Sequence, residues 1–284
     1  MAFLFYLDCM NYICVSGKVM QGDEPALLVA NRGYRYGDGL FETMKLYKGK
    51  ILLQHFHFER LFAGLRLLKY SIPYFFSEDK LVKDILNLCR KNDCEQLARI
   101  RLSVSRGSGG LYEEEQNPSY VIECRPLDES ANRLNENGLL IDIFPDARKS
   151  CDKFSNLKSA SFQPYAMAAV YAKENQLNDC LVLNTSGNIA DSTIANLFLI
   201  KNNVFMTPAL TEGCIDGVMR KYLVAELLKA GQEVRETVIA PASLLDADEI
   251  FLTNAIKGIR WVRQFEERTY GHALTAEIYN SLFR

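Results

Sequence analysis

Histidine is scarce in this sequence, and none of its eight cysteines belongs to a Cys-x-x-Cys pair. A metal centre needs about three or four nitrogen, sulfur or oxygen ligands close together. His55 and His57 stand two positions apart, but the third histidine, His272, is distant in sequence and no carboxylate cluster accompanies them. We therefore expect no metal site. Because the cysteines are scattered, unlike those of a small secreted scaffold, we expect reduced thiols and a cytoplasmic location.

Charge of one sign is never concentrated along the chain. The formal net charge is -2, and no block of like charge is longer than Glu113–Glu115. Proteins that bind nucleic acid usually carry a basic patch, so no nucleic-acid partner is expected. The apolar residues 1–10 are interrupted by Asp8 and lack the basic start of a signal peptide. We interpret them as a strand and expect no membrane segment.

The composition and length are those of a globular protein with more than one domain. The sequence has 284 residues, 48% hydrophobic and 24% charged, which is near the average for soluble domains. Residues 127–137 lie in a polar stretch without a clear period, which is typical of an interdomain linker. The predicted division is an N-terminal domain at 1–126, a linker at 127–137 and a C-terminal domain at 138–284.

Hydrophobic periodicity predicts helices and strands in both domains. The N-terminal strands are expected at 27–29, 42–47, 98–105 and 119–124, with helices around 56–68 and 81–88. The C-terminal strands are expected at 139–144, 180–183, 194–200, 204–207, 233–238 and 249–252, with helices at 164–175 and 217–230. Asn202-Asn203 predicts a tight hairpin, so the sheets must be partly antiparallel. This pattern favours an α+β fold over a doubly wound sheet.

Two motifs in the first half use residues that a plain core would not need. Arg32–Gly39 has three glycines and predicts a constrained turn before a strand. Arg60, in His57-Phe-Glu-Arg-Leu, lies between apolar positions of a helix. Its side chain either extends along the helix surface to solvent or binds an anion.

Two further motifs lie in the second half. Lys158 is followed by small residues and, as a lone lysine, would ordinarily be a solvated surface cation. Potential partners follow in the sequence: Asp191 lies in a small-residue turn, and Gly213–Arg220 opens a helix whose free backbone N–H groups could bind an anion.

In this order the motifs resemble the class IV aminotransferase family. The resemblance rests on Arg32-Gly-x-x-x-Gly-Asp-Gly-x-Phe-Glu-Thr, His57-x-x-Arg-Leu, Lys158, Asp191-x4-Asn-Leu-Phe and Gly213-x3-Gly-x-x-Arg. The family includes branched-chain aminotransferases, D-amino-acid aminotransferases and 4-amino-4-deoxychorismate lyases. The resemblance implies a two-domain fold type IV enzyme dependent on pyridoxal 5'-phosphate (PLP), with a small N-terminal α/β domain, a larger barrel-like C-terminal domain and, usually, a homodimeric assembly.

The resemblance also implies roles for individual residues. Lys158 would form the Schiff base, and Asp191 would face the pyridine nitrogen, where the family generally has Glu. Arg60 and the backbone of Ile215 and Asp216 would hold the phosphate, completed by Asn254 and Ala255. The substrate-side candidates are Tyr36, Thr43, Arg99 and Arg106.

The substrate is less constrained by the motifs. Gln163 stands where branched-chain members carry Tyr, and Leu111 stands where the lyases carry Arg. The leading hypothesis is a transaminase acting between a small, possibly branched-chain, amino acid and a 2-oxo acid. The alternative is a 4-amino-4-deoxychorismate lyase, which releases pyruvate and 4-aminobenzoate, and a third hypothesis is a PLP-binding member without activity.

Overall fold

The computed structural model describes residues 11–113 and 117–283, and the chain divides into two compact units. Unit 1 runs to Glu129 and includes Ser159–Ser161, while unit 2 consists of Ser130–Lys158 and Phe162–Arg284. The strand expected at 1–10 lies outside the described residues.

The stretch predicted as a linker contains the boundary between the two units, and most of its residues belong to unit 2. The unit boundary, between residues 129 and 130, falls inside the 127–137 stretch. Beyond it, the Tyr279 hydroxyl donates to the Asn132 carbonyl at 2.6 Å, and the Trp261 ring N–H donates to the Asn135 carbonyl at 2.6 Å. The backbone carbonyls of this polar stretch accept hydrogen bonds from buried side chains. Its composition is the same as that of a solvated linker, so the sequence alone did not reveal these contacts.

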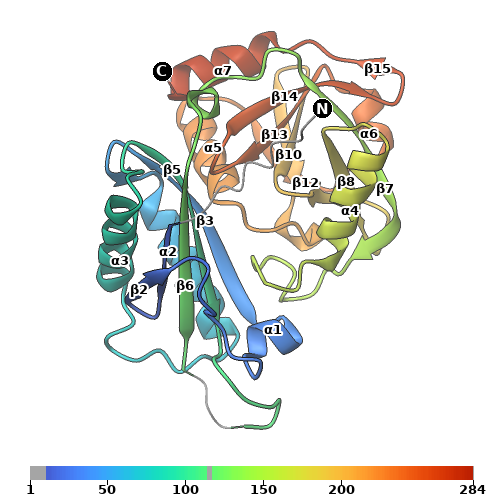
Figure 1. The fold of residues 1–284 in the computed structure, drawn as a ribbon. Helices are drawn as coiled ribbons and strands as arrows, with labels where there is room; N and C mark the ends of the chain where they lie inside the picture. The colour runs from blue at the N-terminus through green and yellow to red at the C-terminus, as the bar shows by residue number, and fades with distance from the viewer. Residues whose placement is uncertain (1–10, 114–116, 284) are drawn as a thin grey trace, which may run out of the picture. The chain divides into compact units, whose positions relative to one another are not determined.

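Unit 1 is an antiparallel sheet with two helices on one face (Figure 1). Its strand order is β2-β1-β6-β5-β3-β4 among the described residues. The strands are β1 (Tyr12–Val15), β2 (Lys18–Gln21), β3 (Gly39–Tyr47), β4 (Lys50–Ile51), β5 (Leu97–Ser105) and β6 (Ser119–Pro126). The helices are α1 (Arg32–Tyr36), α2 (Gln54–Leu67) and α3 (Glu78–Lys91).

The alternation of apolar and polar residues along the central strands of unit 1 determines which face of the sheet is buried. Ile100, Leu102 and Val104 of β5 point into the core, and the residues between them lie on the opposite face. Helix α3 packs on the buried face and begins at Ser77, whose hydroxyl accepts from the Lys80 N–H at 3.3 Å. The strand expected at 27–29 was wrong, because these residues form an exposed loop before α1.

Unit 2 is built on a mixed sheet that curls into a barrel-like form. Its order is β12-β11-β10-β13-β14-β7-β8-β9, with β15 paired to β14, and terminal strand β9 returns to contact β10 and β11. The strands are β7 (Leu139–Lys149), β8 (Asp179–Asn184), β9 (Ile189–Ser192), β10 (Asn196–Lys201), β11 (Val204–Pro208), β12 (Val234–Thr237), β13 (Glu249–Asn254), β14 (Gly258–Phe265) and β15 (Arg268–Thr269). The helices are α4 (Gln163–Glu174), α5 (Val218–Lys229), α6 (Ala242–Leu245) and α7 (Ala273–Phe283).

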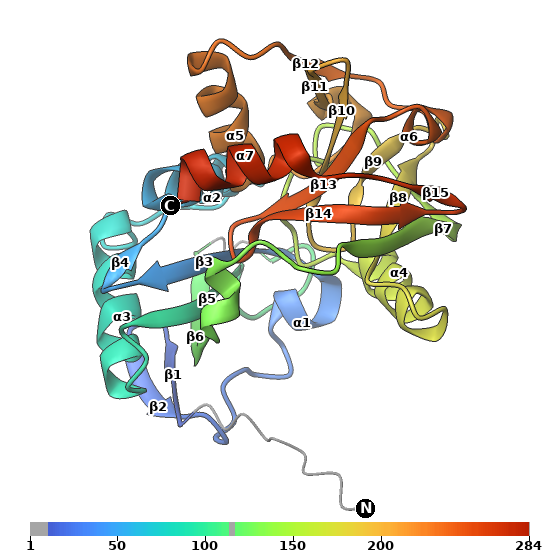
Figure 2. The same ribbon diagram turned by 90° about the horizontal axis from the view of Figure 1, so that it is seen from above.

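The helices of unit 2 cover this sheet at separate places. Helix α4 packs on β7 and β8, and α7 packs on β13 and β14 (Figure 2). The hairpin expected at Asn202-Asn203 is confirmed, because both residues have the positive φ (51° and 62°) of a type I′ turn between β10 and β11. The predicted mixed α+β architecture is therefore confirmed. Among the described residues, no helix is long and apolar enough to cross a membrane.

Candidate functional site

Asp191 is the centre of a buried polar network in unit 2. The carboxylate, on β9, is 1% exposed. The Tyr165 hydroxyl lies 3.0 Å from each of its oxygens, Lys149 Nζ lies 3.4 Å from Oδ2, and the Ile215 N–H donates to Oδ2 at 2.8 Å. Lys149 Nζ also donates to the Tyr165 hydroxyl. The carboxylate thus receives donors from the end of β7, from α4 and from the loop before α5.

Burial dominates the electrostatics of this network. It raises the pKa of Asp191 above the usual 3.8, although the Lys149 charge and the hydrogen bonds from Ile215 and Tyr165 act in the opposite direction. Burial and the neighbouring Asp191 also raise the pKa of Tyr165 well above 10. Tyr165 therefore stays a hydroxyl donor. Lys149 and Tyr165 are residues that the motif analysis missed.

The loop before α5 differs from the prediction. The helix begins at Val218, whereas Ile215 and Asp216 were expected to offer their backbone N–H groups to a phosphate at the helix start. In the structure the Ile215 N–H donates to Asp191 and the Asp216 N–H donates to the Asn156 carbonyl at 3.1 Å. Both amides are therefore used within unit 2, and their role as phosphate donors stays a prediction; the backbone N–H groups at the start of the helix itself are those of residues 218–220.

The start of α5 carries the backbone N–H groups of a helix end, and its first residues, Val218, Met219 and Arg220, are buried. The first N–H groups of an α-helix have no partner within the helix, and Gly217 at the N-cap provides no side-chain cap. Asn196 holds this corner, since its Nδ2 donates to the Ile215 carbonyl at 2.9 Å. A Cβ at Gly217 would lie 1.8 Å from Asn196 Oδ1, so only glycine fits there.

Lys158 lies where the chain passes from unit 2 to unit 1. It is half-buried in an irregular segment between β7 and α4. The next residues belong to unit 1, where Ser159 forms a bridge with Leu40 and the Ala160 N–H donates to the Gly39 carbonyl at 2.8 Å. The backbone immediately after Lys158 is therefore fixed against the start of β3.

Asn254 and Ala255 lie in the turn between β13 and β14. Asn254 Oδ1 accepts from the N–H groups of Ile256 and Lys257 at 3.0 and 2.9 Å, which fixes the turn. Asn254 also lines a cavity of about 400 Å³ within unit 2, together with Asp179 and Ala195. The structure thus places Asn254 at the edge of this cavity, with its side-chain oxygen used inside the turn.

Arg60 of α2 binds a buried carboxylate in unit 1. Its Nε and Nη2 donate to the two oxygens of Glu42 at 2.8 and 2.6 Å, and His57 Nδ1 lies 2.6 Å from the same group. Burial by itself would raise the pKa of Glu42, but the Arg60 charge and the hydrogen bonds from His57 and Arg60 lower it to about 2. Arg60 is therefore oriented by Glu42, and its role as a phosphate ligand stays a prediction.

Arg106 is bound inside unit 1. Its Nε donates to Asp38 at 3.0 Å, its Nη2 donates to the Leu68 carbonyl at 2.6 Å, and its guanidinium lies 4.2 Å from the centre of the Tyr70 ring. Arg32 binds the same Asp38 carboxylate. These contacts fix the Arg32–Gly39 segment, and a substrate-side role for Arg106 stays a prediction.

Thr43 and Arg99 lie on the face of the unit 1 sheet opposite its helices. On this face Lys45 of β3, Arg99 of β5 and Arg125 of β6 are directly opposite one another across neighbouring strands. Thr43 is opposite Arg101 in the next row. Like charges in such positions repel, so this row favours an anion nearby. Tyr36, the last substrate-side candidate, ends α1 and is 44% exposed.

Comparison with known proteins agrees with this arrangement. Residues 39–265 match the family described as "Amino-transferase class IV". An aminodeoxychorismate lyase of Bacillus subtilis (strain 168) is 30% identical, over 91% of this chain and 88% of that protein.

Solved structures show the same fold. The 4-amino-4-deoxychorismate lyase of Pseudomonas aeruginosa has a TM-score of 0.82 and 25% identity, covering 95% of this chain and 97% of that one. The branched-chain amino acid aminotransferase of Escherichia coli has a TM-score of 0.84 and 21% identity, covering 96% and 94%. Another branched-chain amino acid aminotransferase of this fold was solved with pyridoxamine 5'-phosphate. Taken with the motif order and the family match over most of the chain, these similarities establish that the protein belongs to the class IV aminotransferase family of PLP-dependent enzymes.

Proposed function

We propose that this protein is a PLP-dependent transaminase that moves an amino group between a small, possibly branched-chain, amino acid and a 2-oxo acid. The observation that carries the proposal is the arrangement within unit 2. The buried carboxylate of Asp191 accepts a hydrogen bond from the Ile215 N–H, in the loop that precedes α5. The first turn of α5 offers backbone N–H groups that suit a phosphate. Lys158 belongs to the same unit.

The residues present fit the cofactor. The N–H groups of the first turn of α5 suit a phosphate dianion, and Gly217 lets Asn196 pack directly against the start of this turn. Asn254 and Ala255 are kept as further phosphate ligands, and the assignment of Arg60 to the phosphate stays what the family resemblance implies. Asp191, with Lys149 and Tyr165 around it, is the proposed acid for the ring nitrogen.

PLP, when bound, supplies an electron sink that stabilises negative charge at the substrate's alpha carbon. Lys158 has the chemistry to link covalently to the cofactor and, once the substrate displaces it, to accept the alpha proton at Nζ and return it at a new position. Asp191 would hold a proton at the ring nitrogen. Because Lys149 and Tyr165 already donate to Asp191, they position its carboxylate and counter the effect of burial.

The cation row of unit 1 supports a carboxylate-bearing substrate. Lys45, Arg99 and Arg125 place three positive charges opposite one another, whereas in the adjacent row Arg101 is opposite the carboxylate of Glu123. We propose that Arg99 and Thr43 belong to the surface that binds a substrate carboxylate, with Tyr36 at its edge.

A second candidate is 4-amino-4-deoxychorismate lyase, which releases pyruvate and 4-aminobenzoate. It is favoured by the 30% identity to the Bacillus subtilis lyase and by Ser105-Arg-Gly-Ser-Gly-Gly, which resembles the lyase sequence. Its substrate carries two carboxylates, which also suits the cation row. Leu111 stands where the lyases carry Arg, which argues against it.

A half-reaction separates the two candidates. The purified holoenzyme is mixed with single amino acids, without any 2-oxo acid, and its visible absorption is followed. A transaminase converts the cofactor to its amine form and loses the visible band with at least one of them. If no amino acid does this and aminodeoxychorismate alone yields pyruvate, the lyase replaces the transaminase.

We also propose that the protein is a homodimer in the cytoplasm. The family resemblance implies the dimer, and seven free cysteines among the described residues agree with a reducing compartment. Light scattering coupled to size-exclusion chromatography would test the dimer against the 32.3 kDa mass of one chain.

A further inference from the structure

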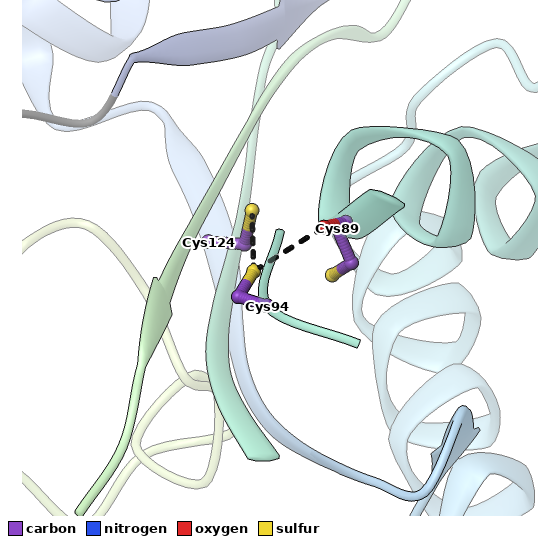
Figure 3. Close-up of side chains that lie close together, drawn as sticks. All are labelled: Cys89, Cys94 and Cys124. Carbon is purple, nitrogen blue, oxygen red and sulfur yellow. Dashed lines mark hydrogen bonds between the residues drawn. The ribbon is translucent and has the colours of Figure 1, made fainter. Parts of the chain in front are cut away.

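Three buried thiols converge below the end of α3 in unit 1. Cys89 lies on α3, Cys94 in the turn that follows it and Cys124 on β6 (Figure 3). Their sulfur atoms all lie within 4.8 Å of one another, and those of Cys94 and Cys124 are 3.5 Å apart. The fold thus brings together residues whose spacing in the sequence forms no recognisable ligand motif.

The hydrogen bonds at Cys124 distinguish this cluster from ordinary core packing. A buried cysteine usually acts as a small apolar side chain. Cys124 instead accepts from Asn92 Nδ2 at 3.2 Å and from the Cys94 thiol. The hydrogen bonds within the cluster lower the pKa of Cys124 and raise the pKa of Cys89 and Cys94, so Cys124 is the thiol whose ionisation they favour. Donors of this kind commonly surround the thiolate ligands of metal ions.

We propose that Cys89, Cys94 and Cys124 form a binding site for a thiophilic divalent ion of the zinc type. Sulfur ligands about 2.3 Å from a zinc ion in tetrahedral geometry lie about 3.8 Å apart, close to the separations here. Thiolates select soft ions over magnesium and calcium, which prefer oxygen. Among the residues that the structure describes, Cys89, Cys94 and Cys124 are the one set of three histidine, cysteine or acidic side chains close enough together to hold a metal ion.

The binding reaction balances without a change of oxidation state. Each of the three thiols gives its proton to solvent as a sulfur–metal bond forms, so three thiolates and a dication leave a single negative charge. The Asn92 N–H partly offsets that charge. Because protons are released, affinity should fall at acidic pH. The ion could reach the site by local opening of the turn at Asp93, which is exposed.

The test uses the reduced, metal-free full chain with Zn²⁺ and Cd²⁺ as probes. We expect one ion per chain and, with Cd²⁺, a thiolate-to-metal charge-transfer band in the ultraviolet. Zn²⁺ should also protect three thiols from alkylation, and mass spectrometry should map them to Cys89, Cys94 and Cys124. This mapping needs no variant and so does not depend on the folding of one.

Two variants provide the comparison. Cys94→Ala with Cys124→Ala should weaken Cd²⁺ binding at least a hundredfold, whereas Cys151→Ala, which removes an exposed thiol of unit 2, should leave it unchanged. The proposal is overturned if Cd²⁺ produces no thiolate band in the wild-type protein. It is equally overturned if protection maps to other cysteines, or if Zn²⁺ leaves Cys89, Cys94 and Cys124 open to alkylation.

Discussion

At the scale of single residues, Asp191 shows how a shorter acid is accommodated at the position where the family generally has Glu. Its carboxylate is surrounded by Lys149, Tyr165 and the Ile215 amide. A buried carboxylate is costly unless it is paired and hydrogen-bonded, and these groups supply both. Among the described residues, Lys149 is the cation that forms an ion pair with Asp191.

Lys149→Met therefore tests the network. Removing one partner of a buried ion pair leaves the other charge uncompensated, so unfolding free energy should fall by about 3 kcal/mol. The pKa of Asp191 should rise further, and the visible absorption of the bound cofactor should change its pH profile. Lys149→Arg should restore most of this profile, and Lys153→Met, at an exposed position, should match the wild type. An unchanged profile in Lys149→Met would show that Lys149 does not influence the cofactor.

Glu42 predicts a pH dependence of stability. Its pKa is lowered from 4.5 to about 2, so its carboxylate stabilises the folded state above pH 4.5 and loses this effect as the pH falls towards 2. At neutral pH the ionised Glu42 carboxylate contributes about 3 kcal/mol to the free energy of unfolding, and about 2 kcal/mol of this is lost by pH 3. In denaturant unfolding, the difference between wild type and Glu42→Gln should shrink accordingly from pH 7 to pH 3.

A surface variant provides the control for Glu42. Glu95→Gln removes a half-exposed carboxylate whose ion pair with Arg90 is long, at 3.4 Å. Its effect should stay within about 0.5 kcal/mol at both pH values. A pH-independent difference for Glu42→Gln would contradict the assigned ion pair.

At the scale of elements, the start of α5 depends on a glycine that fits against Asn196. A side chain at Gly217 would collide with Asn196 Oδ1 and displace the bond that Asn196 makes to the loop. We expect Gly217→Ala to weaken PLP binding to the apo-protein at least tenfold in a fluorescence titration. Gly271→Ala is a matched control because nothing lies within 4 Å of its added Cβ. Equal affinities in the two variants would place the phosphate elsewhere.

The sequence predicted the elements best where the apolar spacing was strong. Helix α3 and strand β5 follow their periodic residues closely. The start of α5 was predicted within one residue, because Gly217 is its N-cap, but Gly213-x3-Gly offers two glycines and the phosphate donors were assigned to the residues between them. Gly213 instead ends a short 3-10 turn with φ of 82°.

The candidate site was predictable only in part, because its partners meet through tertiary contacts. Asp191 and Lys158 were found by motif order, whereas Lys149 and Tyr165 reach Asp191 from β7 and α4. No local spacing connects these positions. The ion pair between Arg106 and Asp38 was likewise not visible in the sequence, because these residues lie 68 positions apart.

At the scale of the whole molecule, the account centres on one lysine at the crossing between two units. Lys158 ends a stretch of unit 2, and residues 159–161 belong to unit 1, where backbone bonds to β3 hold them. A competing lysine exists in unit 2. Lys149 is close to Asp191, but its ammonium is paired with that carboxylate and with Tyr165, which makes it a poor nucleophile.

Borohydride reduction of the holoenzyme, followed by peptide mapping, tests the central claim most directly. Reduction fixes the cofactor to the lysine that carries it. The account predicts one pyridoxyl adduct per chain, on Lys158. An adduct on Lys149, on any other lysine or on none would contradict it.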